Sequence, residues 1–152
     1  MKIVGIDPGL TGAIAIIEDH MLMAVYDMPV LNKRAQATPL IRILSKEHPD
    51  VVVVEDLHAM PRGSIASFSL GYTLGIIIAS VTGLSQPLVR MRPSEWKKIQ
   101  GLIGKDKNAS RLLATERWPS FCDSFRRVKD DGRAEAALIA DAYRKKENGH
   151  AE

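Results

Sequence analysis

Cysteine and aromatic residues are scarce in this chain of 152 residues. The only cysteine, Cys122, has no partner within the chain, so an internal disulfide and a Cys-x-x-Cys metal or redox pair are both excluded. Phe, Trp and Tyr together make up 5% of the residues, and there is no repeat, linker or low-complexity segment. With 45% hydrophobic and 26% charged residues, the composition predicts one globular domain over residues 1–152, in a reducing compartment.

A long hydrophobic run is also missing. The amino-terminal stretch carries a single Lys2 and is interrupted by Asp7, which is not typical of a signal peptide. The apolar segment Leu70–Leu84, with Ile76–Ala79 at its centre, is shorter than the roughly 20 residues needed to span a bilayer. We therefore expect a cytoplasmic protein with no membrane partner and no disulfide partner.

Positive charge is concentrated in the second part of the chain. The net charge is +3, but residues 1–60 carry 5 basic and 8 acidic groups, whereas residues 61–152 carry 16 and 10. This imbalance is compatible with a polyanionic partner, and equally with a surface whose charges only keep the protein soluble. The densest basic stretch predicts a track for a phosphate backbone, or else a solvated helix face, and comprises Arg90, Arg92, Lys97, Lys98, Lys105, Lys107 and Arg111. Trp96 lies within it and can stack on a base or pack inside the protein.

Hydrophobic periodicity predicts an α/β fold. Alternating segments separated by turns indicate a three-stranded antiparallel meander, and four consecutive valines indicate a strand buried on both faces. Helical spacing and caps predict helices between and after the later strands. We thus expect a single domain with a mixed sheet flanked by helices. The predicted strands are Lys2–Asp7, Gly12–Ile17, Met21–Tyr26, Val51–Val54 and Leu88–Met91, and the predicted helices are Thr38–Lys46, Ser64–Val81 (largely buried), Glu95–Gln100, Lys105–Trp118 and one from Asp130 or Asp131 to Lys146.

Four acidic residues stand out by their surroundings. Asp7 ends an apolar strand, and Glu55 ends the valine strand, where a carboxylate needs a compensating partner to stay ionised. Asp131 and Glu135 lie four apart and so share one helical face, where like charges repel unless a cation lies between them. Oxygen ligands without His or Cys favour Mg²⁺ or Mn²⁺ over zinc.

Each acid also has an ordinary structural interpretation. Asp7 before Pro-Gly can be a turn former, and Glu55 can be the polar end of a buried strand. Asp130 and Asp131 can cap a helix and interact with its dipole. The segment from Asp7 to Thr11 also matches the short D-x-G-x-T pattern of sugar kinases and actin-like ATPases, which enclose a nucleotide between two domains. A nucleotide hydrolase or phosphotransferase of the actin-like superfamily is therefore one interpretation of this chain.

Three motifs together resemble the RuvC Holliday junction resolvases, most closely the short phage-borne members. They are I-D-P-G at Ile6–Gly9, the valine strand ending in Glu55, and D-G-R-A-E-A at Asp131–Ala136, in this order along nearly the whole chain. The resemblance implies an RNase H-like fold and a homodimer that cuts four-way and other branched DNA junctions inside a bacterial or phage-infected cell. A catalytically silent junction-binding module, in which the acids are structural, is an alternative, as is the nucleotide hydrolase or phosphotransferase. It also implies two Mg²⁺ or Mn²⁺ ions, held ~3.5–4 Å apart in sites of this type. Their implied ligands are Asp7, Glu55, Asp131 and Glu135, and the implied lysines near the cut strand are Lys97 and Lys107, the latter catalytic.

The chain departs from the family pattern at two places. Cellular members have the two helix acids three apart and end with Asp, so whether Asp130 or Asp131 is the ligand stays open. The family's aromatic residue after the strand acid is replaced by His58 or Met60, which puts His58 among the expected DNA contacts. For the dimer we expect an interface on the helix Ser64–Val81, because its small residues permit close packing.

Overall fold

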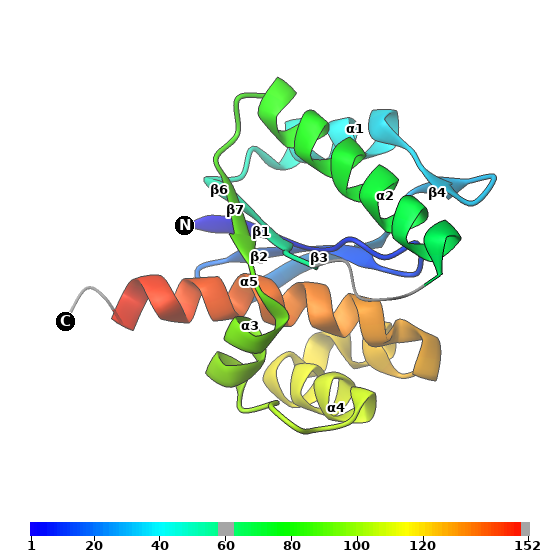
Figure 1. Ribbon diagram of the computed structural model, residues 1–152. Coiled ribbons are helices and arrows are strands. Elements are labelled where there is room, and N and C mark those ends of the chain that lie inside the picture. The colour runs from blue at the N-terminus through cyan, green and yellow to red at the C-terminus, as the bar shows by residue number, and fades with distance from the viewer. Residues whose placement is uncertain (58–62, 150–152) are drawn as a thin grey trace.

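The computed structural model describes residues 1–57 and 63–149, which form a five-stranded mixed sheet with helices on both faces (Figure 1). The strand order is β3-β2-β1-β6-β7. The first three strands form an antiparallel meander, whereas β1, β6 and β7 run parallel. This arrangement confirms the predicted α/β fold. The strands are β1 (Lys2–Asp7), β2 (Ala13–Glu18), β3 (Met21–Asp27), β6 (Val51–Glu55) and β7 (Leu88–Met91).

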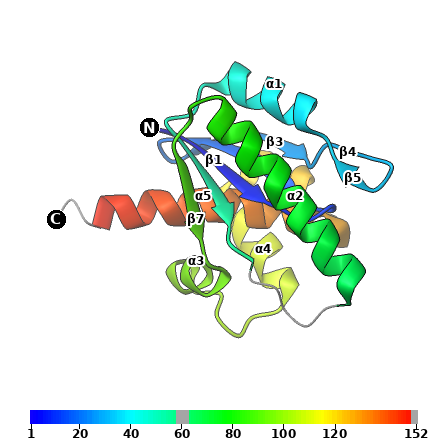
Figure 2. The ribbon, with the colours of Figure 1, turned by 45° about the horizontal axis from the view of Figure 1, so that its top comes forward.

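Two groups of helices cover the sheet. On one face lie α1 (Ala37–Glu47) and α2 (Ser64–Gly83), and on the other lie α3 (Pro93–Gln100), α4 (Lys107–Arg117) and α5 (Asp131–Gly149) (Figures 1 and 2). Two 3₁₀ helices, η1 (Pro119–Phe125) and η2 (Val128–Asp130), connect α4 to α5. The longest helix of the second group, α5, runs across β1 and β2.

The alternation of side chains along the strands creates two separate cores. In β1, Ile3 packs with residues of α5, whereas Val4 and Ile6 pack with residues of α1 and α2. The valines of β6 alternate in the same way, with Val53 on the α5 side and Val54 on the α2 side. Burial on both faces explains why β6 is uniformly apolar up to Glu55.

Close packing of α5 against β1 fixes the start of α5 near the end of β1. A Cβ atom added at Gly5 would lie 2.2 Å from the backbone oxygen of Ala136, so only glycine permits this approach. A Cβ added at Gly132 would similarly lie 2.5 Å from the backbone oxygen of Thr11. The first turn of α5 therefore packs against the turn that follows β1.

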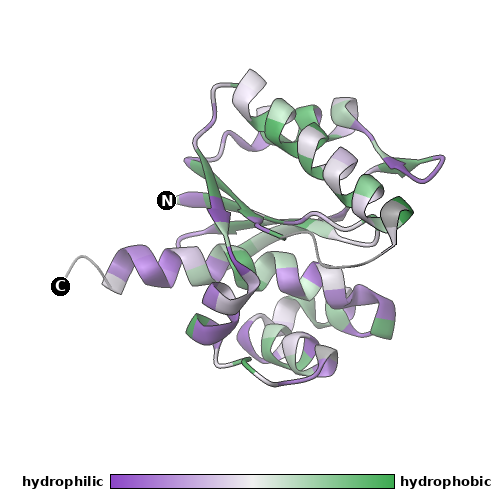
Figure 3. Cartoon of the chain, viewed as in Figure 1, coloured by the Kyte–Doolittle hydropathy of each residue, from purple (hydrophilic) through white to green (hydrophobic). Residues whose placement is uncertain are grey.

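The prediction that the helix after β6 is largely buried is wrong. Only one side of α2 is buried, including Leu74, Ile77 and Val81. Figure 3 shows mostly apolar and neutral colours along the whole helix. The stretch Ile65–Gly83 is also long and apolar enough to cross a membrane by length and composition, a test that core helices of soluble proteins pass as well. The apolar part of α2 is therefore not too short to span a bilayer, contrary to the expectation from the segment Leu70–Leu84.

Smaller differences concern element ends and one hairpin. Helix α1 starts at Ala37, before the predicted cap Thr38. Helix α4 starts at Lys107, because the side chain of Asp106 accepts a hydrogen bond from the backbone N–H of Ala109 at 3.0 Å. The short hairpin of β4 (Val30–Leu31) and β5 (Arg34–Ala35) was not predicted, because strands of two residues are too short to show a period.

Candidate active site

Asp7 lies at the carboxyl end of β1, at the start of a tight turn. Its Oδ1 accepts a hydrogen bond from the backbone N–H of Gly9 at 3.2 Å. Its Oδ2 lies 3.1 Å from the position that a Cβ atom on Gly132 would occupy. The carboxylate of Asp7 therefore faces the first turn of α5.

Glu55 lies at the same edge of the sheet, because β1 and β6 are parallel and Ile6 is paired with Val54. Its side chain is buried, and its Oε1 accepts a hydrogen bond from Nε1 of Trp96 at 2.8 Å. Burial raises the pKa of Glu55. The hydrogen bond from Trp96 and the charge of Lys97 act against this rise, and the negative charge of Glu135 adds to it.

Helix α5 supplies the other two acids. Asp131 is its first residue, and the side chain of Asp131 accepts a hydrogen bond from the backbone N–H of Gly132 at 3.1 Å. Glu135 follows one turn later on the same face, near enough to Glu55 to influence its pKa. The first turn of α5 thus brings acidic side chains to both strand ends.

Asp130 is engaged elsewhere. Its buried carboxylate accepts hydrogen bonds from the side chain of Arg127, at 2.9 and 3.1 Å, and from the backbone N–H of Arg127 at 2.8 Å. Burial acts to raise the pKa of Asp130, but these bonds outweigh it and hold the pKa below its ordinary value. Asp130 therefore serves the turn before α5, and Asp131 is the better candidate for a ligand.

The four carboxylates lie at one edge of the sheet. Asp7 faces the first turn of α5, which begins with Asp131, and Glu55 lies near Glu135. Over residues 1–57 and 63–149, no three Asp, Glu, His or Cys side chains are arranged so that they could hold a metal ion as they stand. The donor chemistry nevertheless fits a hard divalent cation, since all four groups are carboxylates and one is buried. The set of four ligands therefore stays a prediction.

Trp96 has a role that the sequence analysis missed. Of the two interpretations, packing inside the protein is confirmed and stacking on a base is not, because the side chain of Trp96 is completely buried. Instead it donates to the strand-end acid, and Nζ of Lys97 lies 5.2 Å from the centre of its ring. One feature of the sequence could have indicated this bond: Glu55 ends a buried strand, and a buried carboxylate requires a hydrogen-bond donor.

The predicted basic residues have different surroundings. Lys97 and Lys105 line a small cavity of about 40 Å³ together with Glu135, so they lie beside the acidic cluster. Arg90 instead forms an ion pair with Asp56 at 2.9 Å, and Arg111 donates to the backbone oxygens of residues 125 and 126. Arg92 and Lys98 are exposed. Residues His58 and Met60 and the side chain of Lys107 lie outside the described residues, and the DNA contacts stay predictions.

No protein-family model matches this chain, and no curated protein matches it. Solved structures do match. The structure of T. thermophilus RuvC in complex with a Holliday junction substrate is similar with a TM-score of 0.77 and 17% sequence identity, over 98% of this chain and 96% of that chain. The chain has the RuvC fold.

Two other solved structures have a similar fold. The yeast mitochondrial Holliday junction resolvase Ydc2 matches with a TM-score of 0.63 and 16% identity, over 94% of this chain and 77% of that chain. The Fowlpox virus resolvase in complex with Holliday junction DNA matches with a TM-score of 0.61 and 16% identity, over 96% and 98%. The predicted RNase H-like, RuvC-like architecture is thereby confirmed.

Proposed function

We propose that this chain is a metal-dependent, structure-selective DNA endonuclease that cuts four-way junctions and other branched DNA. The observation that carries the proposal is the placement of acids from β1, β6 and α5 at one edge of a RuvC fold. A protein whose structure is similar over nearly the whole chain is described with a Holliday junction substrate. Burial of Glu55 beside Glu135 also supports it, because a cation would relieve the repulsion.

The residues that would hold two divalent ions are Asp7, Glu55, Asp131 and Glu135. When bound, such ions supply an activated water and stabilise the leaving oxygen of a phosphodiester. The indole of Trp96 holds Glu55 in place at the strand end. Asp131 takes the ligand role in preference to Asp130, whose carboxylate is bonded to Arg127.

The basic residues beside the acidic cluster would bind the DNA backbone. Lys97 and Lys105 stand next to Glu135, and Lys107 begins α4. Positive charge at these positions attracts the phosphate adjacent to the cut and stabilises the charge that develops there. The exposed residues Arg92 and Lys98 extend the same stretch of chain.

A homodimer would place two such sites on one junction. The outer side of α2 is suited to a contact between copies, because Gly71, Gly75 and Ala79 are exposed and a Cβ on either glycine would meet no neighbouring atom within 4 Å. Small residues at helical spacing let two helix backbones approach closely. We therefore place the contact between copies on this exposed, apolar side of α2.

One experiment tests the proposed activity. The protein is incubated with a labelled four-way junction and Mg²⁺, and separately with ATP. We expect junction cleavage by the natural chain, junction binding without cleavage by Asp7→Asn, and normal cleavage by the control Glu18→Gln, an exposed acid at the end of β2. ATP turnover with an intact junction would favour a nucleotide hydrolase, and unchanged cleavage by Asp7→Asn would refute the assigned ligand set.

A further inference from the structure

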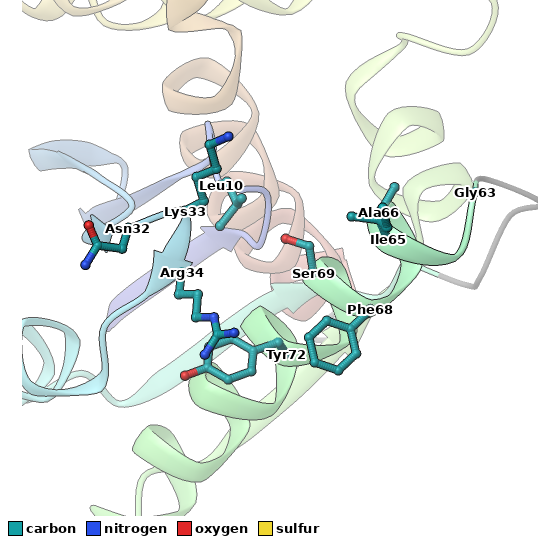
Figure 4. A pocket seen from close by; sticks show the side chains of 10 residues that line it. All are labelled: Leu10, Asn32, Lys33, Arg34, Gly63, Ile65, Ala66, Phe68, Ser69 and Tyr72. Carbon is teal, nitrogen blue, oxygen red and sulfur yellow. The ribbon is translucent and has the colours of Figure 1, made fainter.

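A cavity of about 620 Å³ lies between the β4–β5 hairpin and the first turns of α2 (Figure 4). Phe68 and Tyr72 line it from α2, and the guanidinium of Arg34 lies 5.6 Å from the centre of the ring of Tyr72. Both rings belong to the outer side of α2, so the cavity is part of the surface assigned to the contact between copies. The start of α5 carries a different feature, which none of the sites described above uses.

A side chain in the first turn of α5 bonds to the end of β3. Arg133 donates from Nε to Oδ1 of Asp27 at 2.6 Å, and from Nη2 to Oδ2 at 2.7 Å. Two parallel N–H···O bonds between a guanidinium and a carboxylate fix the orientation of the two groups as well as their distance. Asp130 also lies near Arg133, but the closest atoms are 3.8 Å apart and its carboxylate is bonded to Arg127. Asp27 is therefore the partner that holds Arg133.

Asp27 stands at the same edge of the sheet as Asp7. Ala13 of β2 is paired with Asp7 on one side and with Asp27 on the other, so the three residues form one row across β1, β2 and β3. Neighbouring strands lie about 4.8 Å apart, which separates the backbones of Asp7 and Asp27 by roughly 10 Å. The start of α5 is thus attached to this row at β3, and it faces the same row at β1.

The first turn of α5 precedes the apolar contacts of this helix with the sheet. The buried apolar residues of α5 begin at Ala134, and helix ends fray more readily than helix interiors. Gly132 packs closely, since a Cβ atom there would lie 3.1 Å from Oδ2 of Asp7, but glycine has no side chain that could resist a twist of the helix end. Residues of a helix point about 100° apart, so a twist that released Arg133 would also move Asp131 relative to Asp7.

The pair contributes little to stability as an ion pair. The side chain of Asp27 is 67% exposed and that of Arg133 is 23% exposed. Ion pairs that are open to water are screened, and they typically add little to the free energy of unfolding. The effect of the pair on the geometry of the helix start is therefore larger than its effect on the stability of the fold.

We propose that Arg133 and Asp27 are positioning residues of the acidic cluster. Their two hydrogen bonds hold the first turn of α5 so that the carboxylates of Asp131 and Asp7 stay close enough to share a divalent ion. Neither Arg133 nor Asp27 contacts the ion or the DNA in this role. The assignment rests on the proposed function, because it requires Asp7 and Asp131 to be metal ligands.

The charge of Arg133 gives the test a decisive sign. A cation near a metal site repels the metal ion, so loss of the guanidinium would tighten metal binding if its charge alone mattered. If the guanidinium holds the helix start in place, its loss weakens metal binding instead. Partners of metal ligands typically contribute 10–100-fold to metal affinity, and we expect Arg133→Gln to weaken it by about 10-fold, because Arg133 acts on Asp131 through the backbone.

The experiment measures the binding of Mn²⁺ to the full chain without DNA, by electron paramagnetic resonance of the unbound ion. We expect about 10-fold weaker binding by Arg133→Gln and by Asp27→Asn. The variant that carries both changes should lose nothing further, because both changes remove the same two bonds. Lys146→Gln is the matched control, since it breaks an ion pair of 2.8 Å between the other end of α5 and Glu95 of α3, and it should bind Mn²⁺ normally.

Unchanged or tighter binding of Mn²⁺ by Arg133→Gln would overturn the proposal, and so would losses that simply add in the double variant. If Arg133→Gln does not fold, as judged by circular dichroism, Asp27→Asn decides alone, because it changes an exposed side chain.

Junction cleavage in Mn²⁺ separates this proposal from the function on which it rests. Mn²⁺ binding and cleavage by the natural chain, with unchanged Mn²⁺ binding by the two variants, would leave the nuclease standing and remove the positioning role. A natural chain that neither binds Mn²⁺ nor cleaves a junction would refute the proposed function itself, and the positioning role with it.

Discussion

The indole N–H of Trp96 donates a hydrogen bond of 2.8 Å to Oε1 of Glu55, inside the protein. This bond joins α3 to the end of β6 and holds the buried acid in one orientation. Removing the donor leaves the carboxylate without this partner, which costs about 1–3 kcal/mol. Partners of metal ligands typically contribute 10–100-fold to metal affinity or activity.

We therefore expect Trp96→Phe to lower the free energy of unfolding and to raise the Mg²⁺ concentration needed for half-maximal cleavage. The matched control is Trp118→Phe, since Trp118 is also buried and donates to the backbone oxygen of His20 at 3.2 Å. The control should lose stability but keep its Mg²⁺ requirement. Equal Mg²⁺ titration curves for Trp96→Phe and the natural chain would show that the bond serves the fold alone.

Asp130 and Asp131 are adjacent, but we expect Asp131 to be a metal ligand and Asp130 to stabilise the fold. Asp131→Asn should abolish cleavage of a four-way junction while the protein stays folded, because it removes a predicted ligand. Asp130→Asn should instead lower the unfolding free energy by about 1–3 kcal/mol, since it weakens the bonds to Arg127, and should cleave normally below its unfolding temperature. The two variants are compared by denaturant unfolding and by single-turnover cleavage. The opposite pattern would assign the ligand to Asp130.

Two lysines are expected to act differently on DNA. Lys107→Ala should slow cleavage without abolishing metal binding, because its charge assists the reacting phosphate and does not hold the ions. Lys97→Ala should weaken binding and reduce the slope of log K against log salt by about one. Filter binding over a salt series and single-turnover kinetics measure the two effects. An unchanged cleavage rate in Lys107→Ala would contradict the first role, and an unchanged slope in Lys97→Ala the second.

Asp141 of α5 is the centre of a buried polar network. Its carboxylate accepts hydrogen bonds from Gln100 at 3.0 Å, from Arg144 at 2.7 Å, and from Arg117. Burial acts to raise the pKa of Asp141, but these hydrogen bonds and positive charges outweigh it, and the pKa lies below its ordinary value. The folded chain therefore binds this proton less tightly than the unfolded chain does.

The stability from ionised Asp141 is thus present above the unfolded pKa, about 3.9, and is lost as the pH falls through the lower folded pKa. We expect Asp141→Asn to cost about 3–5 kcal/mol at neutral pH, because a buried pair loses one partner. The difference should narrow below about pH 4. Urea unfolding over a pH series measures it, with Asp123→Asn, an exposed member of the pair with Arg126, as a control of near-zero effect. A pH-independent difference would argue against the lowered pKa.

The outer side of α2 gives a prediction about assembly. Gly75→Arg places a large cation where the structure leaves open space, so the folded chain accommodates it. Replacing a helical glycine stabilises the helix itself by up to about 1 kcal/mol, so unfolding would not explain a change of assembly. We expect a monomer in sedimentation and loss of paired cuts in the two strands. Ser45→Arg on the exposed side of α1 is the control, and a dimeric Gly75→Arg would refute this interface.

The strands were predicted well because their period is local. The strand Leu88–Met91 has the predicted ends, and β1 and β6 differ from prediction by at most one residue. The burial of α2 was predicted wrongly because small and apolar residues occur all around it. Composition alone does not show which side meets the sheet and which side stays uncovered.

The sequence by itself determined which acids follow the strands, where the basic stretch from Arg90 to Arg111 lies, and the order of the elements, since each depends on short sequence patterns. Only the tertiary structure decided which neighbouring acid is bound by Arg127, that Trp96 serves Glu55, and that a hairpin and α2 enclose a cavity with rings and cations. These relationships join segments far apart in the chain. Such contacts depend on how the helices pack over the sheet, which no local pattern specifies.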